Sequence, residues 1–273
     1  MAVPIGSEDD RPGGGVRQEH LEEARCFRCG REGKRLYRLD GFGVVRCPEC
    51  RQVFVSPRLA EGAQADVYHD RSYFDQGIYA GGSRMAASLQ RSWTRGRLEL
   101  IESALPAAAA GRRLLEIGCA YGHFLAAARD RGFDVVGLEF STAAAEQARA
   151  RGLHVEQGRL EDLPEQDGFD VIVFWDVIEH VPDPPAFLQA VREVARPGGV
   201  IAFSCPYFDS VPAKVFRSRW WMLKPDEHIW HFTTRTLRRL FDEAGMPVQQ
   251  LIRSPLARPN VGRFDSVVGV ARR

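Results

Sequence analysis

Short apolar runs alternate with helical patterns from about residue 97 to the end of the chain. This alternation predicts a largely parallel sheet with helices on both faces. The expected strands cover 114–118, 135–140, 154–157, 170–175, 200–206, 248–253 and 266–271, and the expected helices begin near 122 or cover 142–152, 184–195 and 233–245. The pattern therefore predicts an α/β fold with a doubly wound, seven-stranded Rossmann-like sheet.

Two CxxC pairs precede this region. Cys26 and Cys29 form the first pair, and Cys47 and Cys50 form the second, a spacing at which two tight turns bring four thiolates around one tetrahedral ion. A module this short has little core of its own, so a metal supplies much of its folding energy. The pattern favours a structural zinc ribbon over residues 24–58, and iron in the same shell or a redox pair are the alternatives.

The remaining segments complete the expected organisation. We expect a disordered tail over residues 1–23 and an aromatic-rich helical connector over 59–96. The catalytic domain is expected over 97–273, with a lid over 207–232 inside it. The formal net charge of +1 gives no support for a nucleic-acid partner. No signal peptide and no run of about 20 apolar residues is visible, so we expect a cytoplasmic protein without a membrane partner.

The turn after the first expected strand carries the chemistry. Glu116-Ile-Gly118-Cys-Ala-Tyr-Gly122 joins a strand to a helix, and Glu139 ends the next strand. Glycines there let the backbone approach a ligand, and an acid after the second strand can accept hydrogen bonds from two ribose hydroxyls. Ala120 and His123 replace two glycines of a dinucleotide-binding loop, and Glu116 would repel a phosphate, so a cationic ligand fits better. A tight turn without a ligand is the alternative.

The segments LLEIGCAYGHFL, VVGLEFS, GRLEDLP, FDVIVFWDVIEHVPDP and RPGGVIAFSCP resemble successive blocks of class I S-adenosylmethionine-dependent methyltransferases. RCPECRQVFVSPR and EHxWHFT resemble, more narrowly, bacterial small-molecule methyltransferases with an N-terminal CxxC/CxxC zinc ribbon. The family usually has Gly at Ala120 and an acid at Arg159. The resemblance implies that S-adenosylmethionine is bound by Tyr73, Glu116, Gly118, Cys119, Ala120, Gly122, Glu139, Phe140, Leu160, Glu161 and Asp176.

The acceptor is expected beyond the carboxyl ends of the strands, beside WDVIEHV. His180 is one candidate base, and His228, in the block that the resemblance places over the active site, is the second. Asp176, Glu179 and His180 also resemble the set that binds a divalent ion in ubiquinone-pathway O-methyltransferases. The alternative is that these side chains only cap turns and pack.

The leading hypothesis is methyl transfer to a small molecule, with a hydroxyl of a metabolite or sugar derivative favoured over carbon or nitrogen. Cations in the expected lid, such as Arg217, Arg219 and Lys224, can hold an anionic acceptor. A zinc-ribbon RNA methyltransferase and a non-catalytic cofactor-binding scaffold are the alternatives. The oligomeric state is left open.

Overall fold

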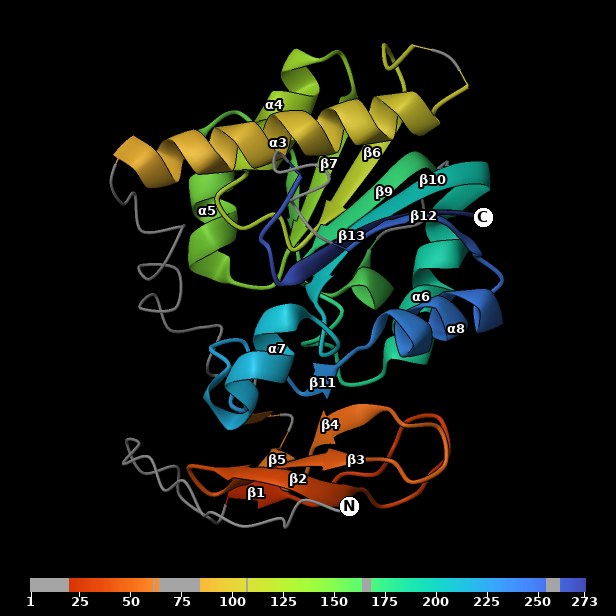
Figure 1. Cartoon of the computed structure of the whole chain (residues 1–273). Helices are drawn as coiled ribbons and strands as arrows, with labels where there is room; N and C mark the ends of the chain where they lie inside the picture. The colour runs from red at the N-terminus through yellow and green to blue at the C-terminus, as the bar shows by residue number, and fades with distance from the viewer. Residues whose placement is uncertain (1–19, 61, 64–83, 107, 164–167, 254–260) are drawn as a thin grey trace.

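The computed structural model describes residues 20–60, 62–63, 84–106, 108–163, 168–253 and 261–273. Its larger part is a seven-stranded sheet of order β12-β13-β10-β9-β6-β7-β8, in which β13 runs antiparallel to both of its neighbours (Figure 1). The strands are β6 (Arg113–Ile117), β7 (Asp134–Glu139), β8 (Val155–Gln157), β9 (Phe169–Trp175), β10 (Ala195–Pro206), β12 (Val248–Ile252) and β13 (Ser266–Arg272). The predicted doubly wound sheet is confirmed. The fifth strand, however, begins five residues earlier than expected, because Ala195 already pairs with Phe169 ahead of a register shift.

Helices cover both faces of this sheet. On one face pack α3 (Arg84–Ala104), α4 (His123–Asp130) and α5 (Thr142–Ala150), and on the other α6 (Pro184–Val194) and α8 (Thr234–Glu243). Each face has its own apolar core: Leu98, Phe124 and Ala145 belong to the first, and Phe187 and Leu237 to the second. The expected boundary at residue 97 lies inside α3, which is a single helix. None of the described helices is long and apolar enough to cross a membrane.

The N-terminal module is a second, smaller sheet of order β11-β4-β3-β2. Its first three strands are β2 (Lys34–Leu39), β3 (Phe42–Arg46) and β4 (Val53–Val55), while β1 (Leu21–Glu22) pairs separately with β5 (Arg58–Leu59). Its fourth strand, β11 (Trp230–His231), comes from the segment between β10 and α8 and pairs antiparallel with β4. The module and the catalytic domain are therefore joined through a shared sheet as well as through the chain.

The expected lid, 207–232, is a folded segment. It contains α7 (Val211–Phe216) and a 3₁₀ turn, η3 (Arg217–Arg219), ahead of β11. Trp220 is 2% exposed and packs with Leu39, Val44 and Val53 of the N-terminal sheet. Its indole Nε1 donates a hydrogen bond to Asp265 Oδ2, which joins the segment to the chain ahead of β13.

Candidate active site

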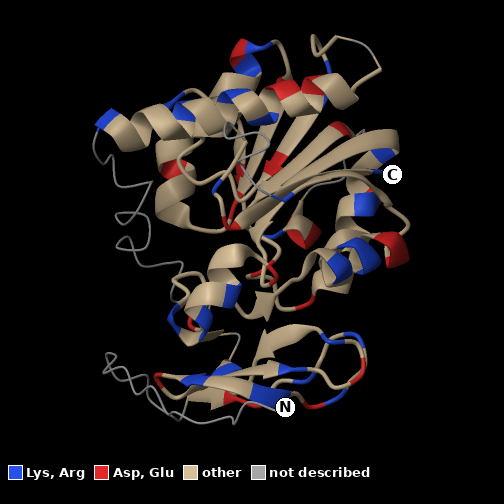
Figure 2. Cartoon of the chain, in the orientation of Figure 1, with Lys and Arg blue, Asp and Glu red and all other residues tan. Residues whose placement is uncertain are grey.

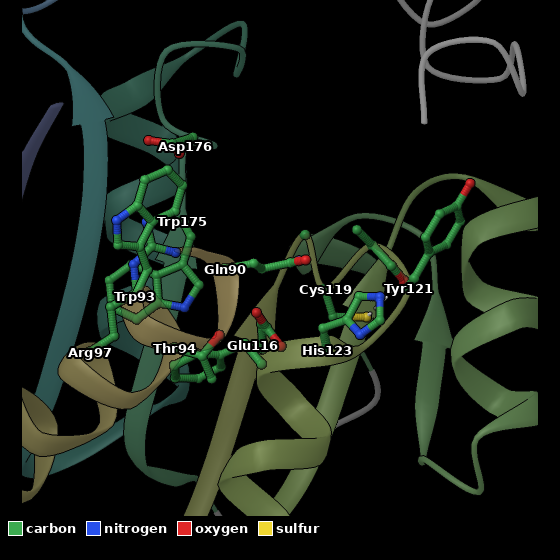
Figure 3. A pocket seen from close by; sticks show the side chains of 13 residues that line it. Gln90, Trp93, Thr94, Arg97, Glu116, Cys119, Tyr121, His123, Trp175 and Asp176 are labelled. Atoms are coloured by element: carbon green, nitrogen blue, oxygen red, sulfur yellow. Dashed lines mark hydrogen bonds between the residues drawn. The ribbon is translucent and has the colours of Figure 1, made fainter. Parts of the chain in front are cut away.

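A pocket lies at the carboxyl ends of β6 and β9, where α3 passes over the turn between β6 and α4. Figure 3 shows Trp93, Arg97 and Trp175 on one side, Cys119, Tyr121 and His123 on the other, and Glu116 between them. The lining residues are Gln90, Trp93, Thr94, Arg97, Glu116, Gly118, Cys119, Ala120, Tyr121, His123, Phe124, Trp175 and Asp176. The structure thus brings five of the predicted cofactor residues to one cavity.

The turn after β6 is bent by three left-handed residues. Gly118 has φ of 71°, Ala120 of 47° and Gly122 of 73°. A Cβ at Gly118 would lie 2.8 Å from Val177 Cγ2, so the turn approaches the loop after β9 closely enough to require glycine. Ala120 adopts a conformation that favours glycine, at a cost of about 1–2 kcal/mol. The departure from the family pattern therefore leaves the shape of the turn intact.

Glu139 holds this turn from the end of β7. Its carboxylate oxygens accept hydrogen bonds from the backbone N–H groups of Ala120 and Ser141, each at 2.8 Å. Burial raises the pKa of the Glu139 carboxyl, and the amides of Ser141, Ala120 and Phe140 oppose that rise. A carboxylate oxygen has two acceptor sites, so each oxygen of Glu139 can accept one hydrogen bond more than the one described.

Glu116 is a buried carboxylate inside the pocket. It is 3% exposed, and its Oε2 has no hydrogen-bond partner among the residues that the structure describes. Burial raises its pKa well above the ordinary value, and the charge of Arg97 opposes that rise. Arg97 itself lies over the ring of Trp175, 4.4 Å from the centroid, and donates to the carbonyl of Val261. The pocket therefore has a carboxyl oxygen without a hydrogen-bond partner among the described residues, and a bound cationic group would favour the charged form of this carboxyl.

The other predicted cofactor residues are not part of the lining of this pocket. Phe140 follows Glu139, and Leu160 and Glu161 lie in η2 (Leu160–Asp162) after β8. Arg159, where the family has an acid, places its guanidinium 5.7 Å from the centroid of the Phe140 ring. Tyr73 lies outside the described residues.

A second group of side chains follows β9. Asp176 has φ of 54°, and its Oδ1 accepts a hydrogen bond from Ser204 Oγ at 2.9 Å. Glu179 is 1% exposed, and neither of its carboxylate oxygens has a hydrogen-bond partner within the described parts of the chain. Burial, and then the charge of Asp176, raise the pKa of Glu179 well above its ordinary value.

The two predicted histidines lie together next to Glu179. The ring centroids of His180 and His228 are 4.8 Å apart. Nδ1–H of His180 donates to the carbonyl of Glu227 at 3.0 Å, and Nδ1–H of His228 donates to that of Met222 at 2.7 Å. Burial lowers the pKa of His180 to about 4, and burial, followed by the charge of His180, lowers that of His228 well below its ordinary value. Both rings are therefore neutral near pH 7, and the neutral His228 ring carries its lone pair on Nε2.

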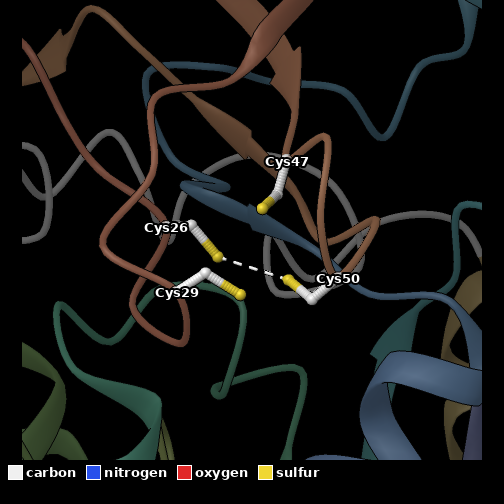
Figure 4. A group of neighbouring side chains, drawn as sticks. All are labelled: Cys26, Cys29, Cys47 and Cys50. Carbon is white, nitrogen blue, oxygen red and sulfur yellow. Dashed lines mark hydrogen bonds between the residues drawn. The ribbon is translucent and has the colours of Figure 1, made fainter.

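The four predicted metal ligands also meet. The sulfur atoms of Cys26, Cys29, Cys47 and Cys50 all lie within 4.8 Å of one another (Figure 4). Backbone amides face the sulfurs: those of Cys29 and Arg28 lower the pKa of Cys26 against its burial, and those of Cys50 and Glu49 act likewise on Cys47. Amides that favour thiolates suit a four-sulfur metal site.

Sequence reasoning missed the contribution of α3 to the pocket. Gln90, Trp93, Thr94 and Arg97 reach it from one face of that helix. Their spacing of three and four residues is the available signal, but it is also the spacing of an ordinary amphipathic helix. It also missed that Trp230 belongs to the N-terminal sheet, because a two-residue strand has no periodicity to read.

Comparison with known proteins agrees with this geometry. A family model described as a methyltransferase domain matches residues 85–251. A ubiquinone biosynthesis O-methyltransferase of Alkalilimnicola ehrlichii is 35% identical over 102 residues, which cover 34% of this chain and 41% of that protein. A probable S-adenosylmethionine-dependent methyltransferase of Mycolicibacterium smegmatis is 37% identical over 117 residues, covering 42% and 45%. The chain thus spans less than half the length of these curated relatives.

Solved structures share the fold at low sequence identity. Magnesium protoporphyrin IX methyltransferase from Synechocystis PCC 6803 with bound S-adenosylhomocysteine has a TM-score of 0.60 at 13% identity, over 78% of this chain and 100% of that one. A Burkholderia thailandensis 1,6-didemethyltoxoflavin-N1-methyltransferase has a TM-score of 0.57 at 18% identity, over 84% and 98%. The seven-stranded sheet has the fold of these class I methyltransferase structures, and the family model and the relatives place the chain in the class of S-adenosylmethionine-dependent methyltransferases. Within that class, the chain belongs to the family of the methyltransferase domain that matches it, as its motifs predicted.

Proposed function

We propose that this methyltransferase transfers the methyl group of S-adenosylmethionine to a hydroxyl of a small-molecule acceptor. The observation that carries the proposal is the pocket at the carboxyl ends of β6 and β9, with the unsatisfied carboxylate of Glu116 inside it and the neutral histidine pair beyond Asp176. The names of relatives such as the ubiquinone biosynthesis O-methyltransferases support oxygen as the methylated atom.

S-adenosylmethionine is proposed to bind in this pocket and along the strand ends next to it. Glu139 would accept the ribose hydroxyls, Glu116 would face the cationic methionine end, and Gly118 would let the backbone approach the ligand. Phe140, Leu160 and Glu161 would flank the adenine, and Asp176 the methionine end. Cys119, Ala120 and Gly122 complete the turn, and a role for Tyr73 stays a prediction. S-adenosylmethionine supplies the methyl group from its sulfonium.

His228 is proposed as the base, and His180, whose Nδ1–H is likewise bound to a backbone carbonyl, is the alternative. The Nδ1–H of His228 is bound to the Met222 carbonyl, so its Nε2 can take the proton of the acceptor hydroxyl. With S-adenosylmethionine bound, the acceptor oxygen would take the methyl group as the carbon–sulfur bond breaks, S-adenosylhomocysteine would be the leaving group, and His228 would hold the proton of the hydroxyl. His180, in edge contact with His228, would orient it or serve as the base itself.

A divalent metal ion is a second candidate for activating the acceptor. Glu179, His180 and His228 have donor atoms within 4.8 Å of one another, and the Glu179 carboxylate is buried without a partner among the described residues. This set differs from the predicted Asp176, Glu179 and His180, because the donor atom that converges with Glu179 and His180 belongs to His228. Such an ion would lower the pKa of a hydroxyl bound to it. Dependence of the rate on added metal, with the cysteine site already loaded, would favour this candidate.

The four cysteines are proposed to hold a structural zinc ion. Their sulfurs converge, and a shell of four thiolates has no open position for catalysis. The formal net charge is only +1, and both acidic and basic side chains lie on the N-terminal module (Figure 2), which favours a small acceptor over RNA. The cations of the 207–232 segment keep an anionic acceptor among the candidates.

The first test is calorimetric titration with S-adenosylmethionine and S-adenosylhomocysteine. Micromolar binding that Glu139→Ala abolishes, and that the exposed control Glu146→Ala leaves intact, would support the site. A tritiated methyl donor with a panel of phenols, sugars and hydroxy acids then identifies the acceptor, with His228→Gln compared against exposed His154→Gln. No cofactor binding by the wild-type protein would overturn the proposal.

A further inference from the structure

Trp230 belongs at once to the N-terminal sheet and to the acceptor side of the site. Trp230 is the first residue of β11, and it pairs with Phe54 of β4 in the antiparallel ladder. The neighbouring Ile229 adds to this pairing, since its carbonyl accepts a hydrogen bond from the Val55 amide at 3.0 Å. The strand that completes the cysteine module thus begins two residues after His228.

On the module side, the indole ring of Trp230 touches a cysteine turn. The ring of Phe27, which lies between Cys26 and Cys29, meets it edge-on at a centroid distance of 4.9 Å. Phe54 packs against it at 5.7 Å, and the Arg58 guanidinium lies 5.7 Å from the indole centroid. Because the conformation of Phe27 depends on its flanking thiolates, the metal site fixes the surface on which the indole rests.

On the catalytic side, Trp230 holds the loop after β9 by two hydrogen bonds. Its backbone N–H donates to the carbonyl of Glu179 at 3.1 Å, and its indole Nε1–H donates to that of Val181 at 2.8 Å. The two acceptors flank His180. Trp230 is 2% exposed, so both bonds are shielded from water and costly to leave unmade.

We infer that the metal-loaded cysteine module positions the Glu179–Val181 loop through Trp230, which makes Trp230 a positioning residue for the acceptor half of the site. The inference rests on the proposed function for the meaning of that loop, and it extends the module beyond a purely structural role. The path runs from the Cys26–Cys29 turn through Phe27 to the indole, and from the indole to the two carbonyls beside His180.

The cofactor half is held by different contacts. The Gly118 and Cys119 amides donate to the Leu138 carbonyl, and the Ala120 amide donates to Glu139. These bonds lie within the large sheet. Asp176 at the start of the loop is held separately, by Ser204. Loosening Trp230 should therefore affect the part of the loop around Glu179–Val181 while it leaves cofactor affinity unchanged, a separation that a general loss of stability would not produce.

Hydrogen exchange followed by mass spectrometry tests this inference on the full-length, zinc-loaded protein. Trp230→Phe removes the indole donor and keeps an aromatic ring, and Trp221→Phe is the matched control because Trp221 is 40% exposed in the same segment. We expect exchange in residues 176–181 to be roughly tenfold faster in Trp230→Phe than in the control, because a buried hydrogen bond is lost. Exchange in β6 and β7, and the Kd for S-adenosylhomocysteine, should stay within about twofold, a change worth less than about 0.5 kcal/mol. Equal exchange of 176–181 in the two variants would overturn the inference.

Two further readouts separate this inference from the proposed function. Removal of the metal from the wild-type protein by a chelator should accelerate exchange in 176–181 as Trp230→Phe does, and protection that survives metal removal would contradict the coupling. With an acceptor from the screen, Trp230→Phe should lower kcat about tenfold with KM for S-adenosylmethionine unchanged. The exchange experiment needs no acceptor, so its result stands even if the screen finds none.

Discussion

The cofactor half and the acceptor half of the site are built in different ways. The cofactor half is formed by the ends of adjacent parallel strands and the turn between β6 and α4, where Ala120 and Glu139 are joined by a direct hydrogen bond. The acceptor half joins the loop after β9 to His228, which lies 48 positions beyond His180 in a segment that also completes the N-terminal sheet. The first half depends on local turns, and the second on contacts between distant segments.

Because of this difference, substitutions in the two halves should affect ligand binding and folding to different degrees. A local turn is fixed by backbone conformation and a few hydrogen bonds, so substitutions there should change binding more than folding. An assembly of distant segments depends on the packing of whole elements, so substitutions in the module should change folding first. Each of the following predictions tests one side of that contrast.

The largest effect is expected from Cys47→Ala, which breaks the four-thiolate shell. Bound zinc should fall to near zero, and stability should drop by more than about 3 kcal/mol, or roughly 10 °C in Tm. Zinc analysis and thermal unfolding measure both. Cys205→Ala, which removes a buried thiol of the large sheet, is the control. Equal melting of the two variants with full zinc content would refute the role of the metal.

Glu116→Gln should move binding and stability in opposite directions. The folded-state pKa of Glu116 is raised above its unfolded value, so this carboxyl costs stability in the cofactor-free protein at pH 7, and the uncharged amide of Gln should raise Tm. The same change should weaken S-adenosylmethionine binding about tenfold, because a charge-assisted contact is lost. Calorimetry and thermal unfolding provide the two numbers. A variant that binds as well as wild type would place the cationic end of the ligand elsewhere.

The affinity for S-adenosylhomocysteine should fall several-fold on acidification from pH 7 to pH 5. Burial raises the pKa of Glu139, so this carboxylate protonates at a higher pH than an exposed glutamate and then loses its capacity to accept from two hydroxyls. Titrations are best made in the Glu116→Gln background, which removes the buried carboxyl of the pocket whose pKa is also raised. A flat profile between these pH values would argue against Glu139 as the ribose ligand.

The smallest effect is expected from Ala120→Gly. Glycine relieves the left-handed strain at φ of 47° but adds entropy to the unfolded chain, for a net gain of about 0.5–1 kcal/mol. Ala126→Gly, inside α4, should instead cost about 1 kcal/mol. Urea denaturation compares the pair. A loss in both variants would mean that the Ala120 methyl makes packing contacts worth more than the strain.

The same contrast explains what the sequence could predict. The large sheet and the cysteine cluster follow from short-range patterns, and both are found as expected. The turn from Glu116 to Gly122 could likewise be predicted from its own residues, because its glycines and its acid stand between a strand and a helix. The contribution of Arg97 and Trp93 to the pocket could not be predicted, because it depends on how α3 packs over the sheet. The pairing of Trp230 with Phe54 has no local signal at all.

The shared strand also sets the order in which the protein can be completed during synthesis. The chain leaves the ribosome from its N-terminus at about 5–20 residues per second, so β11 emerges roughly 10–35 s after β4. Until then the edge of β4 has no neighbour, and the apolar ring of Phe54 lacks its indole cover. The first module to be translated is therefore among the last to be finished, and for that interval the nascent chain exposes a strand edge on which chaperones or other chains can act.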